Sequence, residues 1–169
     1  MPWNTPETGW IDGAIVGTSD MNAIGEDLNY LKAMPFDNYL LQEGADYSTS
    51  STSFTDIDSS DLALSVTTTG GDLEISFYGS FNINTSAFVY LDVDVDGTRV
   101  GLDDGLVIEN LSSGVAGRTV GFIVRKSGLS AAAHTIKLQW KVSANTATLY
   151  AGAGTSAKDV HGMFCAKEV

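Results

Sequence analysis

The fold is decided by residues 73–81, LEISFYGSF, in which apolar residues stand at odd positions while Glu74, Ser76 and Ser80 stand between them. A period of two is that of a β-strand with one face turned to a core. Residues 89–95, VYLDVDV, repeat the pattern with valine and leucine at the odd positions. Both segments therefore predict strands that each supply one face to a core.

The same strand signal recurs along the chain from residue 53 onward. Turn sequences separate the candidates, and Asp96-Gly97 is the clearest hairpin turn among them. The segment 119–124, TVGFIV, is apolar at nearly every position, and we expect protein contact on both of its faces, either inside the sandwich or at a subunit contact. Because no helical pattern lies between the candidates, they predict a mainly β fold, an antiparallel jelly-roll β-sandwich with a short N-terminal helix. The candidate strands are 53–58, 62–68, 72–83, 87–95, 98–102, 106–109, 119–126, 135–142, 146–151 and 162–168.

One helix is predicted before the strands. Thr18 or Ser19 is its N-cap, and it ends near Ala33, before Pro35. Its apolar residues are spaced three, four and three apart, as in the seam of a coiled coil. Two heptads are too short to hold an oligomer alone, so the seam lies either at an oligomer axis or against its own domain. The seam residues are Met21, Ile24, Leu28 and Leu31.

The N-terminal residues 1–17 have no helical period and are punctuated by proline and glycine. Trp3 and Trp10 give this leader apolar surface to bury, on another chain or on its own domain. We expect three parts: an anchoring leader at 1–17, a helix and connector at 18–46, and the jelly-roll domain at 47–169. The Ser/Thr run at 48–53 is expected to be a linker into the first strand.

The charge balance excludes some classes of function. The chain has 9 basic and 21 acidic residues, a formal net charge of −12, which repels phosphate backbones and anionic membrane surfaces. No apolar run approaches the roughly 20 residues that span a bilayer, and residues 1–10 lack the pattern of a signal peptide. We therefore expect no nucleic-acid binding, no membrane insertion and synthesis in a cytoplasm.

A calcium loop is the sharpest candidate site. Asp92, Asp94 and Asp96, with Asp103 at the twelfth position, match its spacing, although the last position usually carries glutamate. Valines alternate with the aspartates as in a strand, and no helices flank the segment. Two interpretations stay open, a calcium site or a solvated strand face that ends in a hairpin. On one strand face the aspartates repel unless solvent, a cation or a basic side chain compensates them, and Arg99 is the nearest basic candidate.

No pattern of catalytic residues marks the chain as an enzyme. His134 and His161 lie outside metal-binding spacings and beside no obvious nucleophile. Cys165, the single cysteine, lies in an apolar stretch and is expected to be buried. We expect no catalytic residue, no cofactor other than calcium, and a hydrogen bond from His134 to the loop that precedes it.

Two regions resemble a known family. Residues 10–17 (WIDGAIVG), 19–22 (SDMN) and 28–32 (LNYLK) resemble the opening of many bacteriophage virion proteins. The second half resembles the jelly-roll heads of phage fibres and decoration proteins, which share the fold of the tumour-necrosis-factor and complement globular heads. This second likeness rests on residues 93–99 (VDVDGTR), 105–106 (GL), 128–131 (GLSA), 134–140 (HTIKLQW) and 164–169 (FCAKEV).

The resemblance implies a non-enzymatic homotrimer on a virus particle, made in the host cytoplasm and located in the virion. It would be a capsid decoration protein or a short head or tail fibre, attached through its N-terminal segment to capsid or tail proteins. The oligomer or anchor residues would be Trp3, Trp10, Met21, Ile24, Leu28 and Leu31.

The alternative function is a receptor- or carbohydrate-binding module of a fibre tip, with a host surface glycan as its ligand. Aromatic residues could form a platform for a sugar, although such residues more often belong to a core or an interface. The candidates are Trp140, Tyr150, Tyr78 and Tyr90.

Overall fold

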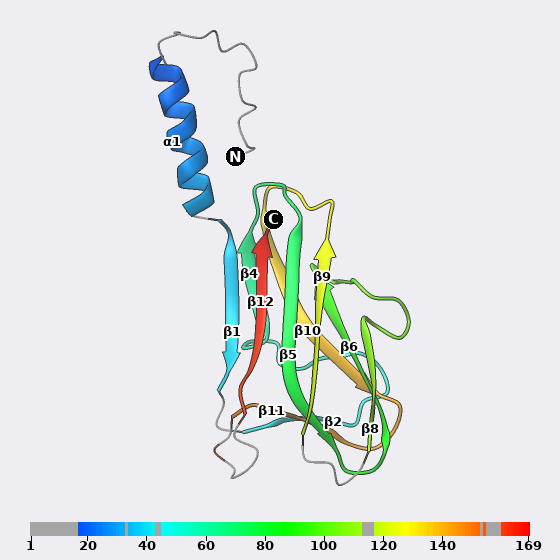
Figure 1. Cartoon of the computed structure of the whole chain (residues 1–169). Helices are drawn as coiled ribbons and strands as arrows, with labels where there is room; N and C mark the ends of the chain where they lie inside the picture. The colour runs from blue at the N-terminus through cyan, green and yellow to red at the C-terminus, as the bar shows by residue number, and fades with distance from the viewer. Residues whose placement is uncertain (1–16, 33, 43–44, 113–116, 153, 155–159) are drawn as a thin grey trace.

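The structure is a computed structural model, which describes residues 17–32, 34–42, 45–112, 117–152, 154 and 160–169. The described part is mainly β, with one helix, α1 (Thr18–Lys32), before the strands (Figure 1). The strands are β1 (Phe36–Leu41), β2 (Tyr47–Thr49), β3 (Thr55–Asp56), β4 (Ala63–Thr67), β5 (Leu73–Ile83), β6 (Ala87–Val95), β7 (Thr98–Arg99), β8 (Val107–Leu111), β9 (Arg118–Lys126), β10 (Ala133–Val142), β11 (Ala147–Tyr150) and β12 (Gly162–Glu168).

The strands form two antiparallel sheets. In the first, sheet A, β5 has β9 on one side and β12 on the other, β1 follows β12, and β11 and β2 continue beside the end of β5. In the second, sheet B, β10 lies between β6 and the pair β3 and β4, while β7 and β8 lie on the far side of β6.

The order of pairing identifies the fold as a jelly roll. Among the main strands, β1 pairs with β12, β4 with β10, β5 with β9, and β6 with β8, so each pair is nested inside the previous one along the chain. Nested pairing divided over two facing sheets is the jelly-roll topology. The predicted fold class is therefore confirmed.

The core lies between the two sheets and follows the alternation of the sequence. The odd residues of β5 and of β6 are buried, as the pattern of residues 73–81 and 89–95 predicts. They meet the even residues of β10, and the ring of Trp140 lies 6.4 Å from that of Phe81. The predicted strand faces are confirmed.

Two strands lie outside the predicted set. β1 pairs with β12 from Phe36↔Lys167 to Leu41↔Gly162, so the sandwich begins at Phe36 and not at residue 47. β2 pairs with β11, so the Ser/Thr run predicted as a linker begins inside sheet A. The sequence signal is weak because β1 is an edge strand with only one fully buried residue, Leu41, and β2 has only three residues.

Helix α1 forms where the spacing pattern predicts it, but its predicted N-cap is wrong: the N–H of Met21 donates to the carbonyl oxygen of Gly17, so Gly17 is the N-cap and Thr18 is already helical. It continues from the start of β1 and projects beyond the end of the sandwich (Figure 1). Met21, Ile24 and Leu28 are exposed, so this part of the seam is not packed on its own domain. No helix of the described part is long and apolar enough to cross a membrane. The leader with Trp3 and Trp10, and the side chain of Leu31, lie outside what the structure describes.

Candidate functional site

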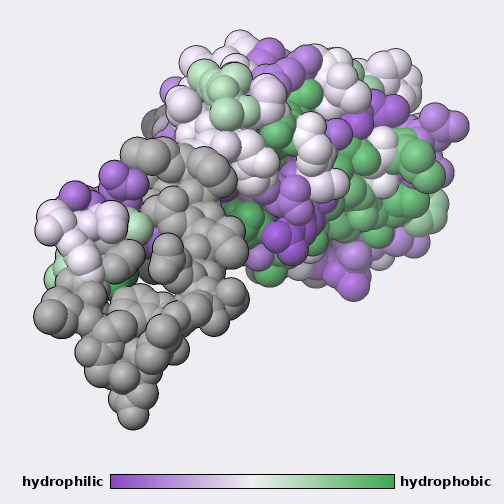
Figure 2. Space-filling view, turned by 90° about the horizontal axis from the view of Figure 1, so that it is seen from above, coloured by the Kyte–Doolittle hydropathy of each residue, from purple (hydrophilic) through white to green (hydrophobic). Residues whose placement is uncertain are grey.

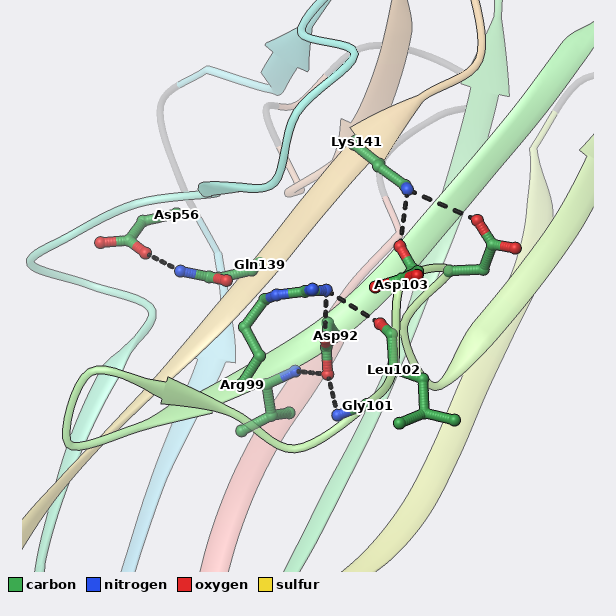
Figure 3. Close-up of polar contacts among 10 residues, drawn as sticks. Asp56, Asp92, Arg99, Gly101, Leu102, Asp103, Gln139 and Lys141 are labelled. Carbon is green, nitrogen blue, oxygen red and sulfur yellow. Dashed lines mark hydrogen bonds and ion pairs between the residues drawn. The ribbon is translucent and has the colours of Figure 1, made fainter.

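The polar centre of sheet B is Asp92 on β6. Its side chain is fully buried, and its Oδ2 accepts a hydrogen bond from Nη1 of Arg99 at 2.9 Å (Figure 3). The backbone N–H groups of Gly101 and Val93 donate to Oδ1, each at 2.8 Å. A buried carboxylate needs such donors, because burial without them is costly. Arg99 is the basic partner that the sequence pattern pointed to.

The next two aspartates of β6 and its turn are held separately. Oδ1 of Asp94 accepts the backbone N–H of Gly97 at 2.8 Å, inside the turn. Asp96 and Gly97 both have positive φ, 53° and 84°, which is the type I′ hairpin that an Asp-Gly pair predicts. Asp96 turns to another strand, where its Oδ1 accepts the N–H of Thr135 at 2.8 Å.

His134 on β10 completes this contact. Its Nδ1 lies 2.6 Å from Oδ2 of Asp96, and its Nε2 lies 3.0 Å from the carbonyl oxygen of Ser130. Both ring nitrogens face acceptors, and only the protonated imidazolium can donate to both. The hydrogen bond with Asp96 raises the pKa of His134 above its usual value, and the same bond lowers the pKa of Asp96. The predicted bond from His134 to the preceding loop is confirmed.

The four aspartates of the calcium pattern are not brought together. Asp103 lies exposed on the loop between β7 and β8, and its backbone oxygen accepts a hydrogen bond from Nζ of Lys141 at 2.8 Å. Asp92, Asp94 and Asp96 each accept donors from a different part of the chain. In the part of the chain that the structure describes, no three His, Cys, Asp or Glu side chains are placed to hold a metal. The turn is the predicted hairpin, but the predicted solvated strand face is wrong for Asp92 and Asp94, which are both buried.

The loop at residues 101–105, which we call the Leu102 loop, is tied to sheet B at nearly every residue. Nη1 of Arg99 donates to the carbonyl oxygen of Leu102 at 3.0 Å, and the N–H of Gly105 donates to the same oxygen at 2.9 Å. Lys141 holds the other side through the backbone of Asp103, and its Nζ lies 3.5 Å from Oδ1 of Asp104. Figure 3 shows Arg99 and Lys141 reaching the loop from two sides.

Aromatic rings lie against the two cations that hold the loop. The guanidinium of Arg99 lies 4.4 Å from the ring centroid of Phe54, and Nζ of Lys141 lies 4.8 Å from the same centroid. Lys141 also lies 4.7 Å from the ring centroid of Tyr90. Such cation–π contacts add to the hydrogen bonds and hold both side chains in one position. The sequence offered no signal for Phe54, since it stands in a Ser/Thr-rich segment.

A second ion pair lies beside this cluster. Asp56 on β3 accepts hydrogen bonds from Nζ of Lys137 at 2.9 Å and from Nε2 of Gln139 at 2.8 Å. Burial works to raise the pKa of Asp56, but the bonds from Gln139 and Lys137 outweigh it and lower that pKa. The pair joins β3 to β10 and keeps the carboxylate ionised.

The four aromatic residues proposed as a sugar platform do not share a surface. Trp140 and Tyr150 are buried. Tyr78 lies on sheet A and Tyr90 on sheet B, where Lys141 covers its ring. The hypothesis of a platform built from these four is therefore wrong, because strand alternation sends them to different faces.

Cys165 is free and buried, as expected. It lies between Asn38 and Ser76 in the register of sheet A. Burial raises the pKa of its thiol, which keeps it protonated at neutral pH and lowers its reactivity.

The outer face of sheet A carries apolar side chains across its strands. Phe36 and Leu40 of β1, Tyr78 of β5 and Ile123 of β9 are all exposed, and Ile123 reaches 74%. In one row of the register Leu40, Met163, Tyr78 and Gly121 lie side by side. We call this surface the sheet A face. Of the two alternatives for segment 119–124, burial of both faces inside the sandwich is wrong, since Ile123 is open to solvent, while a contact with another subunit stays a prediction.

Comparisons with known proteins give no family. No family model matches the sequence, and no curated protein is similar to it. Solved structures with some similarity include a dimeric latent PorU from Porphyromonas gingivalis, at 11% identity and a TM-score of 0.40. That match covers 80% of this chain and 13% of PorU.

Particles of infectious bursal disease virus are also among the similar structures. The Gx strain structure has 14% identity and a TM-score of 0.34, covering 79% of this chain and 36% of that one. The T13 particle has 14% identity and a TM-score of 0.37, covering 79% and 35%. This chain thus spans about a third or less of each of these proteins, and similarity at this level carries no inference about function.

Proposed function

We propose that this chain is a non-enzymatic structural protein of a virus particle, a homotrimer of the capsid-decoration or short-fibre type. Its N-terminal segment would attach it to other capsid or tail proteins. Burial of apolar surface between copies would stabilise the assembly without any chemical step.

The observation that carries the proposal is the sheet A face. The outer face of a sheet that meets water is normally polar, whereas this one exposes Phe36, Leu40, Tyr78 and Ile123. Its charges are balanced, because Lys167 pairs with Glu74 at 2.9 Å and Arg125 with Asp72 at 3.0 Å. A second copy can therefore approach despite the net charge of −12.

Helix α1 also favours association with further copies of this chain. It continues directly from β1, one of the strands of the sheet A face, and its Met21, Ile24 and Leu28 are exposed. Copies that meet through the sheet A face would bring their helices to one end of the assembly. One event, association with further copies, would then cover both apolar surfaces.

The solution mass tests the proposal, measured by light scattering behind size exclusion on the full chain and on a version lacking residues 1–34. The described core begins at Leu41, so the shorter version keeps its buried residues. We expect a mass near three chains for both versions. A trimer only in the full chain would assign the contact to α1 or the leader, while single chains in both would overturn the proposal.

The virion location needs a separate measurement. Purified particles of the virus that encodes the chain should contain it, detectable by mass spectrometry, in a fixed ratio to the major capsid or tail protein. Absence from purified particles would overturn the virion part of the proposal, whatever the mass in solution.

A further inference from the structure

The Leu102 loop is fixed to sheet B by several hydrogen bonds, yet it exposes a large apolar side chain to solvent. Leu102 is 86% exposed, the most exposed large apolar residue of the described part. The loop leads into β8, where Ile108 is exposed, and Phe88 is exposed on the neighbouring β6. It projects from the side of the sandwich away from α1 (Figure 1), where hydrophobic residues gather at the surface (Figure 2).

A single exposed leucine is ordinary on a protein surface, so exposure alone implies nothing. The difference lies in how the loop is built. Its carbonyl oxygens accept hydrogen bonds from Arg99 and Lys141 beneath it, and Gly101 donates to the buried Asp92. Every one of these bonds uses backbone groups of the loop, which leaves the side chain of Leu102 pointing away from its own sheet.

Close backbone packing also restricts the loop. A Cβ on Gly105 would come within 2.5 Å of the carbonyl oxygen of Leu91, and a Cβ on Gly101 within 2.5 Å of Gly105. The loop therefore lies directly on β6 and has little freedom to lose when a partner binds. A group held in its bound position before association pays less conformational entropy than a mobile one.

The charges beside Leu102 indicate the kind of partner. Asp103 and Asp104 follow it directly and are exposed, and the side chain of Asp104 is 66% exposed. Lys141 holds the backbone oxygen of Asp103 and lies 3.5 Å from Oδ1 of Asp104, a long contact that leaves most of the Asp104 carboxylate open to a further basic group. An apolar side chain next to two carboxylates complements an apolar pocket bordered by lysine or arginine.

We propose that the Leu102 loop is a docking element for a protein partner whose surface has an apolar pocket bordered by basic side chains. Leu102 enters the pocket, and the carboxylates of Asp103 and Asp104 meet the basic border. The loop belongs to sheet B and is thus opposite the sheet A face. If the proposed trimer forms through that face, three such loops point outward, and a repetitive partner surface can be bound at several points.

The test uses the full chain and a synthetic helical peptide of leucine and lysine, whose leucines form one stripe with lysines on both sides. Binding is followed by nuclear magnetic resonance of the leucine methyl groups and backbone amides. We expect shifts concentrated at Leu102 and the amides of residues 101–105. A peptide with serine in place of leucine should lose this binding, since it keeps the charge and lacks the apolar stripe.

Substitutions complete the test. Leu102→Ser should weaken binding of the peptide about tenfold, because a buried leucine side chain is lost from the contact. Leu40→Ser, a matched exposed leucine on the sheet A face, should leave the affinity per chain unchanged, whatever it does to the solution mass. The combined Asp103→Asn and Asp104→Asn variant should bind more weakly and with less dependence on salt.

Three results would overturn the proposal: shifts spread over the acidic surface, an affinity that Leu102→Ser does not change, or concentration-dependent shifts at Leu102 in the chain alone. The last would assign the loop to a second copy. None of them depends on the trimer, so the loop and the proposed function can fail separately.

Discussion

At the scale of single residues, Asp92 is the carboxylate on which the Leu102 loop depends. It is fully buried, and among the described residues its one ion-pair partner is Arg99. Arg99→Met should lower the free energy of unfolding by about 2–3 kcal/mol, less than for a fully buried pair because Arg99 is partly exposed. Chemical denaturation measures the change.

The control is Arg125→Met, which removes a similar pair with Asp72 in an exposed position. Its expected cost is below about 1 kcal/mol, as for most surface pairs. Equal losses for the two variants would contradict the role given to the buried carboxylate.

His134 makes the stability of the sandwich depend on pH. The folded state raises the pKa of His134 through the bond with Asp96, so the folded state binds the proton more tightly than the unfolded chain. The stabilisation is complete below the usual pKa of histidine and is lost as pH rises through the folded value. We expect the melting temperature to fall over that range, and the fall to be smaller in His134→Gln. A flat profile in the unmodified chain would contradict the charged pair.

Calcium removal is a third residue-scale test. Asp92, Asp94 and Asp96 are each occupied by donors of the chain itself, so a chelator should not change the melting temperature. A clear fall with chelator, restored by added calcium, would show that a cation binds to carboxylates outside the arrangement described above.

At the scale of elements, the turns around β7 depend on glycine for two different reasons. Gly97 and Gly105 both have positive φ, but only Gly105 packs against neighbouring backbone. A Cβ added to Gly105 would lie 2.5 Å from the carbonyl oxygen of Leu91. Gly97→Ala should cost roughly 1 kcal/mol for the backbone conformation alone. Gly105→Ala should cost ~3 kcal/mol or more because the clash is added. Similar melting temperatures for both variants would show that the loop can move away from β6.

At the scale of the whole molecule, the two sheets differ in what they offer to other molecules. The sheet A face combines exposed apolar side chains with paired charges, while sheet B carries the acidic Leu102 loop. Ile123→Asp should convert the proposed trimer to single chains, since an isoleucine that the trimer contact would bury is replaced by a charge in each copy. Ile108→Asp, an equal change on sheet B, should leave the mass of a trimer intact. Light scattering distinguishes the two, and the opposite result would place the contact on sheet B.

Much of the fold could be predicted because strand alternation is a local property. The strands from β3 to β12 overlap the predicted candidates, through alternation in β5 and β6 and through an apolar run in β9, and α1 lies where the spaced apolar positions predict it. β1 and β2 could not be found this way. An edge strand buries few residues, so nothing in its sequence needs to alternate.

The candidate site could be predicted only in part. Asp92 and Arg99 lie seven positions apart, and a hairpin brings them together, which the Asp-Gly turn signals. The contributions of Lys141 and Gln139 on β10 and of Phe54 just before β3 come from segments distant in sequence, and no local pattern marks them.

The sequence by itself determined the mainly β class, the helix, the hairpin at Asp96-Gly97 and the faces of the central strands, since each depends on residues close along the chain. Only the tertiary structure decided which aspartates accept hydrogen bonds from which donors, and that the four aspartates of the calcium pattern do not lie together. It also decided which apolar residues remain exposed. Those outcomes depend on which sheet neighbours β10 and β5 acquire, and pairing between distant strands is set by packing of the whole sandwich.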